Sequence, residues 1–465
     1  MDTIIKNGKV VIPKVGVIDA SILINNGKIA AIVKNDENCQ ANEVIDATGK
    51  YIFPGLIDPH VHWGLYGDPL PDSTEHESAS AAIGGFTTAL QYRRSPGPDF
   101  NIEHVGKLLD DMTPNTYIDY SLQLFVTKNI HKDSIPYAVE ELGVTSFKFF
   151  TTEREERVNS NICGLSDSNI AEPYTDGFAY ECMEQIAKYN GHVVANFHPE
   201  NYELVERIAP KIRDNNETGL AAWDHARPEI AEAETIARLG YFADKTGCPL
   251  YLVHISCAEA ADKVAACKKT NDKVWGETCP HYLVLNTESA IGELAKVNPP
   301  LRDQKNNELL WKALADGTLD TVGSDNCACK RSVKEGGIWD AAPGFAGTAT
   351  ILPVLLSEGY QKGKISLERI AEVTSYNAAN IFNLAPQKGN LLPDCDADLV
   401  IVDLDLEKTV DAAFLKSYSD FSVFEGMKLK GWPVCTMLKG EIIAKDGEII
   451  GSPNGNFLKR NGFLK

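Results

Sequence analysis

Helical stretches alternate with short apolar strands through most of this sequence, and this alternation is the feature that most limits its fold. Each unit reads as a helix and then a strand that closes on polar residues: 134–145 and 146–150, 179–191 and 192–201, 228–247 and 249–256, 258–271 and 273–280, 306–318 and 319–326. Repeated helix–strand units predict a parallel sheet. Their span of roughly 300 residues favours a closed (β/α)8 TIM barrel, an α/β fold.

A doubly wound open sheet is the alternative arrangement of the same units. Sheets of that kind that bind nucleotides carry glycine-rich phosphate loops, and neither G-x-G-x-x-G nor a Walker signature occurs here. The barrel is therefore the preferred prediction. Both ends of the chain differ from the middle, because the first roughly 50 residues and the last stretch read as short strands with turns.

Charge and composition exclude several classes of partner. The 465 residues carry a net charge of -20, which argues against binding to nucleic acid or to an anionic membrane surface. The N-terminal residues 1–14 do not resemble a signal peptide, and we find no apolar run long enough to span a bilayer. The eleven cysteines are scattered from Cys39 to Cys435, so we expect reduced thiols in a cytoplasmic protein.

Histidines and one aspartate lie where the predicted strands end. "GLIDPHVHWG" at residues 55–64 places His60 and His62 two residues apart, so both point to one side of an extended strand. Other strand ends supply His198, His254 and Asp325. Active sites of TIM barrels form at the C-terminal ends of the strands. A single histidine there is more often structural, but this set predicts a site for divalent transition metals.

Lys148 lies inside the predicted strand "SFKFF", where lysine is rarely buried without a partner. An ordinary reading is a lysine that pairs with an acid or reaches solvent. Its place among the strands that carry histidines suggests another role. A neutral lysine amine can add carbon dioxide to form an anionic, bidentate carbamate. Two metal ions need such a bridge, and the strand ends supply only one other carboxylate, that of Asp325.

These segments resemble the cyclic amidohydrolase branch of the metal-dependent amidohydrolases, which holds dihydropyrimidinases, hydantoinases, allantoinases and dihydroorotases. The resemblance is carried in order by "GLIDPHVHWG", "SFKFF", "FHPEN", "YLVHISC", "ETCPHYL", "NPPLR", "VGSDNC" and the segment 377–403. It implies a β-sandwich built from both termini beside the barrel. We therefore expect three parts: sandwich residues 1–53, a catalytic barrel at 54–384, and the rest of the sandwich with a tail at 385–465.

The resemblance also implies two zinc ions per chain. One would be bound by His60, His62 and Asp325, the other by His198 and His254, with Lys148 as N6-carboxylysine between them. A hydroxide shared by the metals would attack the ring carbonyl near neutral pH. Asp325 would take its proton and return it to the leaving nitrogen. Relatives form homotetramers, so we expect a dimer or tetramer, and Asn298 falls near residues that contact the substrate ring.

Some positions depart from the family pattern. Dihydropyrimidinases and hydantoinases carry a tyrosine five residues after the bridging lysine, and here Glu153 stands there. A carboxylate cannot donate to an oxyanion unless it is protonated. The arginine of the dihydroorotases is replaced by Gly64. "SDNC" at 324–327 matches dihydropyrimidinases, whereas "ETCPHYL" is closer to allantoinases.

Arg93 and Arg94 follow the likely strand "TTALQY", where relatives tend to have an apolar or neutral pair. An ion pair or a solvated loop is the ordinary reading of two such arginines. Arginine also binds carboxylates in a bidentate manner, so both are candidate substrate contacts, together with Glu153 and Asn298.

The leading hypothesis is a zinc-dependent hydrolase of the dihydropyrimidinase and hydantoinase type, acting on a small cyclic amide or ureide. The nearest alternative is an allantoinase or another cyclic-ureide hydrolase. A different class is the dihydropyrimidinase-related assembly protein, which keeps the fold but loses the metal ligands. All six ligand positions are filled in this chain, which favours an enzyme.

Overall fold

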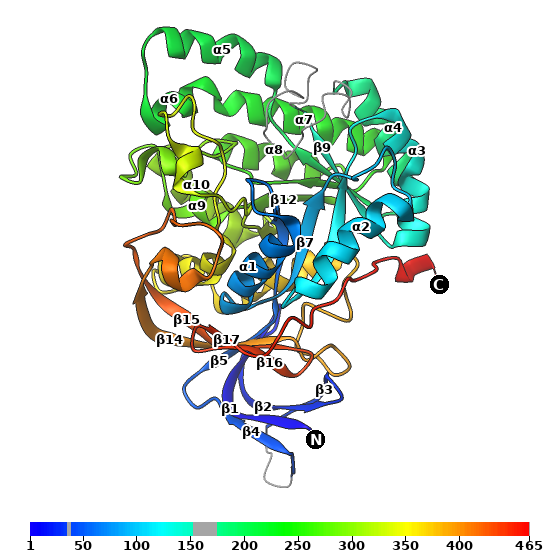
Figure 1. Ribbon diagram of the computed structural model, residues 1–465, viewed down its shortest axis with the longest axis vertical. Helices are drawn as coiled ribbons and strands as arrows, with labels where there is room; N and C mark the ends of the chain where they lie inside the picture. Colours follow the sequence, from blue (N-terminus) through cyan, green and yellow to red (C-terminus); the bar gives the residue numbers. More distant parts are fainter. Residues whose placement is uncertain (35–38, 152–173, 465) are drawn as a thin grey trace.

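The computed structural model describes residues 1–34, 39–151 and 174–464. Its larger part is a barrel surrounded by helices, and a sheet formed by both ends of the chain lies beneath it (Figure 1). Among the described residues, no helix combines the length and the apolar character that a membrane span requires.

Eight parallel strands form the barrel in sequence order. They are β6 Leu56–Val61, β7 Phe86–Arg93, β8 Asp119–Phe125, β9 Ser146–Phe150, β10 Val194–His198, β11 Leu250–Leu252, β12 Val274–Thr278 and β13 Thr321–Val322. A parallel bridge between Val61 and Asn326 links the first strand to the segment after the last. This arrangement confirms the predicted TIM barrel.

Helices cover the outside of the barrel. They are α1 Leu70–Ile83, α2 Ile102–Met112, α3 Asn129–Tyr137, α4 Asp176–Ala187, α5 Tyr202–Asp214, α6 Gly219–Ala226, α7 Glu229–Thr246, α8 Ala258–Lys268, α9 Pro280–Val284, α10 Gln304–Asp316, α11 Ile351–Val354, α12 Leu367–Ala371 and α13 Asn377–Ile381. In α2, buried Val105, Leu108 and Met112 recur at helical spacing, and the Asn101 side chain accepts a hydrogen bond from the first turn. An apolar stripe and a cap of this kind explain why the segment is helical.

The terminal sheet has nine strands from both ends of the chain. They are β1 Thr3–Ile12, β2 Gly16–Asn25, β3 Lys28–Val33, β4 Glu43–Asp46, β5 Tyr51–Pro54, β14 Leu399–Thr409, β15 Lys428–Leu438, β16 Glu441–Lys445 and β17 Glu448–Ile449. The two ends meet where β5 pairs antiparallel with β14, with Ile52 opposite Ile401. The sheet confirms that both termini build one layer beside the barrel, while the limits 1–53, 54–384 and 385–465 stay predictions.

The last residues of the chain return to the floor of the barrel, the end at which the strands begin. We call residues 454–461 the C-terminal strap. The backbone nitrogen of Tyr120 donates to the Asn456 carbonyl at 2.9 Å, and that of Leu458 donates to the Tyr120 carbonyl at 2.7 Å. Farther along, the Arg460 nitrogen donates to the Gly143 carbonyl at 2.8 Å. The strap appears in red beneath α2 and α3 (Figure 1).

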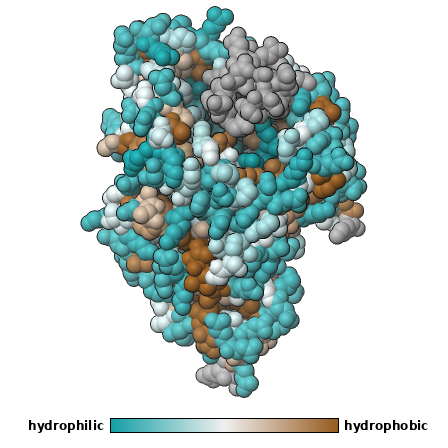
Figure 2. All heavy atoms as spheres, in the orientation of Figure 1, coloured by the Kyte–Doolittle hydropathy of each residue, from teal (hydrophilic) through white to brown (hydrophobic). Residues whose placement is uncertain are grey.

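The surface is mostly hydrophilic, as the net charge of -20 leads one to expect. On the face seen in Figure 2, apolar side chains gather chiefly in the lower half, over the terminal sheet. Exposed apolar residues of that layer include Val15, Val17, Ile18 and Val44. Neighbouring exposed apolar residues, such as Val15, Val17 and Ile18 here, often mark contacts between protein chains.

Candidate active site at the strand ends

His60, His62 and Asp325 meet at the C-terminal end of the barrel. His60 lies near the end of β6, His62 follows that strand, and Asp325 follows β13. The Asp325 Oδ1 atom lies 3.1 Å from His60 Nε2 and 3.2 Å from His62 Nε2, and the two imidazole nitrogens are 3.2 Å apart. The structure therefore brings these three predicted residues together.

The tautomer of His60 shows what this cluster can bind. Its Nδ1 lies 2.7 Å from Oε1 of the buried Glu277, so Nδ1 carries the proton and Nε2 presents a lone pair. That lone pair faces the Asp325 carboxylate, which is also an acceptor. Acceptors that converge in this way are stabilised by a positive charge between them, which a metal ion would supply. Two ligands of one tetrahedral zinc ion are roughly 3.3 Å apart, which is close to the distances found here.

His198 and His254 form a second pair across neighbouring strand ends. His198 Nδ1 lies 2.9 Å from His254 Nε2, and both side chains are buried. His198 Nε2 lies 2.6 Å from Oε2 of Glu200, which is held by Arg227 at 3.0 and 2.7 Å. Glu200 therefore fixes the His198 tautomer, with the Nδ1 lone pair directed toward His254.

Lys148 lies between these pairs in the barrel interior. Its side chain is buried on β9, with Nζ 4.7 Å from the centre of the Tyr92 ring and 5.2 Å from that of Phe150. In the sheet it lies opposite Asn196 of β10, two residues before His198. The structure thus places the lysine on the strand beside a candidate ligand, inside an aromatic pocket.

Burial sets the charges of the cluster for metal binding. It lowers the pKa of His62 to about 4 against the opposing effect of the Asp325 carboxylate, and His60 and Lys148 add smaller lowering contributions. Burial also holds the pKa of His254 well below its ordinary value. Although burial alone would raise the pKa of Asp325, the neighbouring His60 and His62 hold it well below 3.8. Glu277 and Asp325 raise the pKa of His60 against the effect of burial. Neutral His62 and His254 and a charged Asp325 are the forms that bind metals.

Two of the candidate ligands have an unusual backbone. His254 has φ of 45° and Asp325 has φ of 52°, in the left-handed region that non-glycine residues seldom adopt. Such strain persists only where surrounding contacts impose it, and it concentrates at functional sites. For Asp325 those contacts come from its neighbours. The Asn326 carbonyl accepts from the His62 nitrogen at 2.8 Å, and the Ser324 hydroxyl donates to buried Asp58 at 2.5 Å.

The predicted substrate contacts lie in different surroundings. Arg93 donates from Nη1 to the carbonyl oxygen of Trp63 at 2.6 Å, beside His62, and Arg94 lies over the Phe125 ring at 5.1 Å. The Asn298 side chain accepts from the Trp223 indole at 3.1 Å. Glu153 lies outside the described residues. Arg93 and Arg94 therefore belong to strand β7 and the segment just after it, next to the cluster.

A second group of carboxylates, Asp119, Asp396 and Asp398, lies at the other end of the barrel. Lys388 Nζ approaches them at 2.8, 3.3 and 2.5 Å. The ammonium group already neutralises much of this charge, so the group is a structural ion-pair cluster rather than a metal site.

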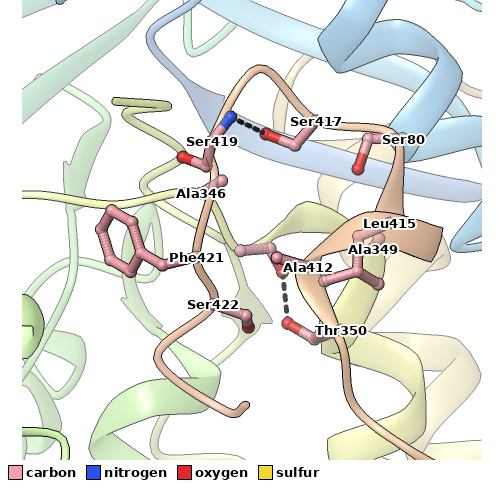
Figure 3. A pocket seen from close by; sticks show the side chains of 11 residues that line it. Ser80, Ala346, Ala349, Thr350, Ala412, Leu415, Ser417, Ser419, Phe421 and Ser422 are labelled. Atoms are coloured by element: carbon pink, nitrogen blue, oxygen red, sulfur yellow. Dashed lines mark hydrogen bonds between the residues drawn. The ribbon is translucent and has the colours of Figure 1, made fainter. Parts of the chain in front are cut away.

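Figure 3 shows a small cavity between the barrel and the segment 412–422, lined by serines and by Phe421. Its volume of about 10 Å³ suits a single water molecule. A ring substrate could not enter it, so this cavity is not the reaction site.

Sequence reasoning missed the acidic residues that orient the histidines. Glu277 is the penultimate residue of β12, accepts from the Tyr251 hydroxyl at 2.8 Å, and accepts from the His254 backbone nitrogen at 3.1 Å. Glu200 follows His198 by two residues. Both lie at strand ends, so the pattern that identified the histidines could also have found them. Arg227 follows α6 and had no local signal.

The comparisons with known proteins agree with this geometry. A family model described as the amidohydrolase family matches residues 51–443. A D-hydantoinase from Geobacillus stearothermophilus is 34% identical, covering 99% of this chain and 97% of the relative. The chain belongs to the cyclic amidohydrolase branch of the amidohydrolase family.

Other relatives of this amidohydrolase carry different names. An allantoinase from Desulfitobacterium hafniense is 32% identical and covers 98% of both chains. The crystal structure of a dihydropyrimidinase from Brevibacillus agri superposes with a TM-score of 0.89 at 28% identity, covering 99% of both chains. The likeness therefore extends over the whole length, and the family expected from the sequence motifs is confirmed.

Proposed function

We propose that this amidohydrolase opens a cyclic amide or ureide ring by hydrolysis, as hydantoinases and dihydropyrimidinases do. The observation that carries the proposal is the set of acceptor atoms that converge at the strand ends. The Nε2 atoms of His60 and His62 and the Oδ1 atom of Asp325 lie within 3.2 Å of one another, and Glu277 binds the other ring nitrogen of His60. Family membership supports the same reaction class.

The donor set fits two zinc ions. His60, His62 and Asp325 would bind the first, and His198 with His254 the second. Lys148, as N6-carboxylysine, would supply the anionic bridge that its strand position between the pairs allows. When bound, zinc lowers the pKa of a water molecule and polarises a carbonyl oxygen.

The protein's own groups complete the reaction. Asp325 is a charged carboxylate at neutral pH, so it can accept the proton of the attacking water and pass it to the ring nitrogen as that nitrogen leaves. Glu277 and Glu200 hold His60 and His198 by their other ring nitrogens, which keeps the lone pairs aimed at the centre. The strained backbone of Asp325 fixes the direction of its carboxylate.

Arg93 and Arg94 favour a substrate with an anionic or strongly polar substituent. Each charge-assisted hydrogen bond contributes on the order of 1.5–3 kcal/mol, which corresponds to roughly 10- to 100-fold in catalytic efficiency over a neutral analogue. We include Asn298 and Glu153 as proposed substrate contacts. Arg93 donates to the Trp63 carbonyl and Arg94 lies over the Phe125 ring, so both arginines lie beside the candidate ligands.

An allantoinase is the second candidate. The Desulfitobacterium hafniense allantoinase is 32% identical, against 34% for the D-hydantoinase, so overall similarity does not separate the two substrates. The non-catalytic assembly proteins are disfavoured because every proposed ligand position is filled.

We also propose that the protein is cytoplasmic and forms a homodimer or homotetramer. The ten cysteines of the described chain are all free thiols, as expected for a reducing compartment. The exposed apolar residues of the terminal sheet offer an interface for a second copy.

A hydrolysis panel tests the proposed function. Zinc-loaded protein is assayed with hydantoin, dihydrouracil, allantoin and carboxylate-bearing analogues, and ring opening is followed by product analysis. We expect at least one ring to open, with carboxylate-bearing analogues preferred and that preference reduced in Arg94→Ala. Equal efficiency on neutral and charged rings in both proteins would refute the arginine role. Arg207→Ala, which removes an exposed arginine of α5, is the matched control.

A further inference from the structure

A layer of polar side chains lies directly beneath the candidate ligands in the barrel. Ser146 precedes Lys148 by two residues on β9, and Asn196 precedes His198 by two residues on β10. Residues two apart on a strand point to the same side, so this layer faces the barrel interior. Both side chains are fully buried. Interiors of TIM barrels are usually filled by branched apolar residues, so a polar layer needs an explanation.

Gln123 of β8 joins this layer to three strands that carry candidate ligands. Its Oε1 accepts from the Ser146 hydroxyl at 2.8 Å and from the Asn196 amide at 2.6 Å. Its Nε2 donates to the carbonyl oxygen of Pro59 at 2.7 Å, and Pro59 immediately precedes His60. One amide group therefore touches the strands of His60, Lys148 and His198.

Arg460 enters the same layer from the barrel floor, carried by the C-terminal strap. Its guanidinium donates to the Ser121 hydroxyl at 2.8 Å, the Ser146 hydroxyl at 2.9 Å, the Leu122 carbonyl at 2.5 Å and the Phe382 carbonyl at 3.4 Å. Only 1% of the residue is exposed. Among the described residues, hydroxyl and carbonyl oxygens rather than carboxylates accept from this buried cation. Burying a charge in this way costs desolvation free energy, so the position of this guanidinium calls for an explanation.

The guanidinium gives the hydrogen-bond chain a fixed direction. Arginine has donors only, so the Ser146 oxygen must accept from Arg460 and its proton must go to Gln123. The Gln123 oxygen then faces Ser146 and Asn196, and its NH₂ group faces Pro59. Without Arg460, the serine proton could turn away from Gln123, and the amide would lose one of the three contacts that hold it against the Pro59 carbonyl.

We propose that Arg460 is a positioning residue for the active site. It acts through Ser146 and Gln123 to fix the strands that carry His60, Lys148 and His198 relative to one another along the barrel axis. This inference rests on the proposed function in one respect, because its effect is measured as zinc release and turnover at the proposed metal site. It assigns a role in the site to the far end of the chain, 400 positions from His60 by sequence numbering.

The test compares Arg460→Ala and Ser146→Ala with Lys459→Met. Lys459 is the neighbouring strap residue, but its ammonium donates at the surface to the Glu141 carbonyl, so its loss controls for the strap itself. In zinc-loaded protein, the release of zinc to a chelator and the values of kcat and KM are measured. Changes to groups that orient metal ligands typically cost 10–100-fold. We expect zinc release to be ~10-fold faster or more and kcat to fall by a similar factor, with KM little changed.

Rescue separates positioning from general destabilisation. Millimolar guanidinium, far below denaturing levels, should slow zinc release in Arg460→Ala and leave Ser146→Ala unaffected. If Arg460→Ala does not fold, Ser146→Ala decides alone, because it leaves Arg460 bound to Ser121 and Leu122. Zinc release and kcat equal to wild type in Ser146→Ala and in any folded Arg460→Ala would overturn the proposal, even if the melting temperature falls. An inactive wild type would refute the proposed function, while zinc release would still test Arg460.

Discussion

Single side chains set both the chemistry and the charge balance of this site. Asp325 combines a lowered pKa, a strained backbone and contact with two imidazoles. In Asp325→Asn an oxygen remains to approach the metal, but the group can no longer carry a proton. We expect zinc content to stay near that of wild type and kcat to fall at least ~10²-fold, as for loss of a general acid–base group. Exposed Asp316→Asn is the control, and near-normal turnover in Asp325→Asn would assign proton transfer elsewhere.

Another residue-scale prediction concerns Lys296, which is 3% exposed. Burial lowers its pKa from 10.5 to about 7, assisted by the nearby cations Lys334 and Arg227. Between pH 7 and 10.5 the unfolded chain therefore binds a proton that the folded chain lacks, so the free energy of unfolding contributed by this group rises with pH. Lys296→Met removes this dependence.

The measurement is the melting temperature of Lys296→Met minus that of wild type, followed from pH 7 to pH 10. We expect the difference to be most favourable to the variant at pH 7 and to shrink steadily as the pH rises. Exposed Lys312→Met should show no such trend. A difference that is constant with pH would mean that Lys296 keeps its ordinary pKa in the folded protein.

At the scale of elements, the helix–strand alternation predicted the barrel because period and polarity are local properties of the chain. The predicted strand boundaries also indicated that His60, His198 and Asp325 would lie at the C-terminal end of the barrel. The remaining parts of the site depend on distant contacts. Arg460 reaches Ser146 across 314 positions, and the left-handed backbone of Asp325 is imposed by neighbours that no local pattern reveals. The tautomers of the histidines likewise needed the positions of Glu277 and Glu200.

The joint between barrel and terminal sheet yields a prediction at this scale. Lys388 links Asp119 at the start of β8 to Asp396 and Asp398 just before β14. Lys388→Met would leave buried carboxylates without this cation, a change that typically costs about 3–5 kcal/mol. We expect a clearly lower melting temperature with kcat per folded molecule unchanged. Lys364→Met is the surface control, and an unchanged melting temperature in Lys388→Met would show that Lys439 and Lys28 suffice.

The whole molecule presents a barrel that carries the chemistry and a terminal sheet with exposed apolar residues. Val15, Val17, Ile18 and Val44 lie on that layer. We expect association through it into a dimer or tetramer, measured by light scattering at micromolar concentration. Val17→Lys combined with Val44→Lys should shift the assembly toward smaller species. A wild-type monomer at that concentration would refute the prediction.

The most direct test of the account follows ring opening as zinc is added to metal-free protein. The rate on the best cyclic substrate should rise with zinc and level off at about two ions per chain. In Lys148→Ala, which lacks the proposed bridging group, both zinc content and rate should fall, and a small carboxylic acid should restore part of each. Ring opening that is independent of zinc, or no ring opening by any zinc-loaded sample, would contradict the account.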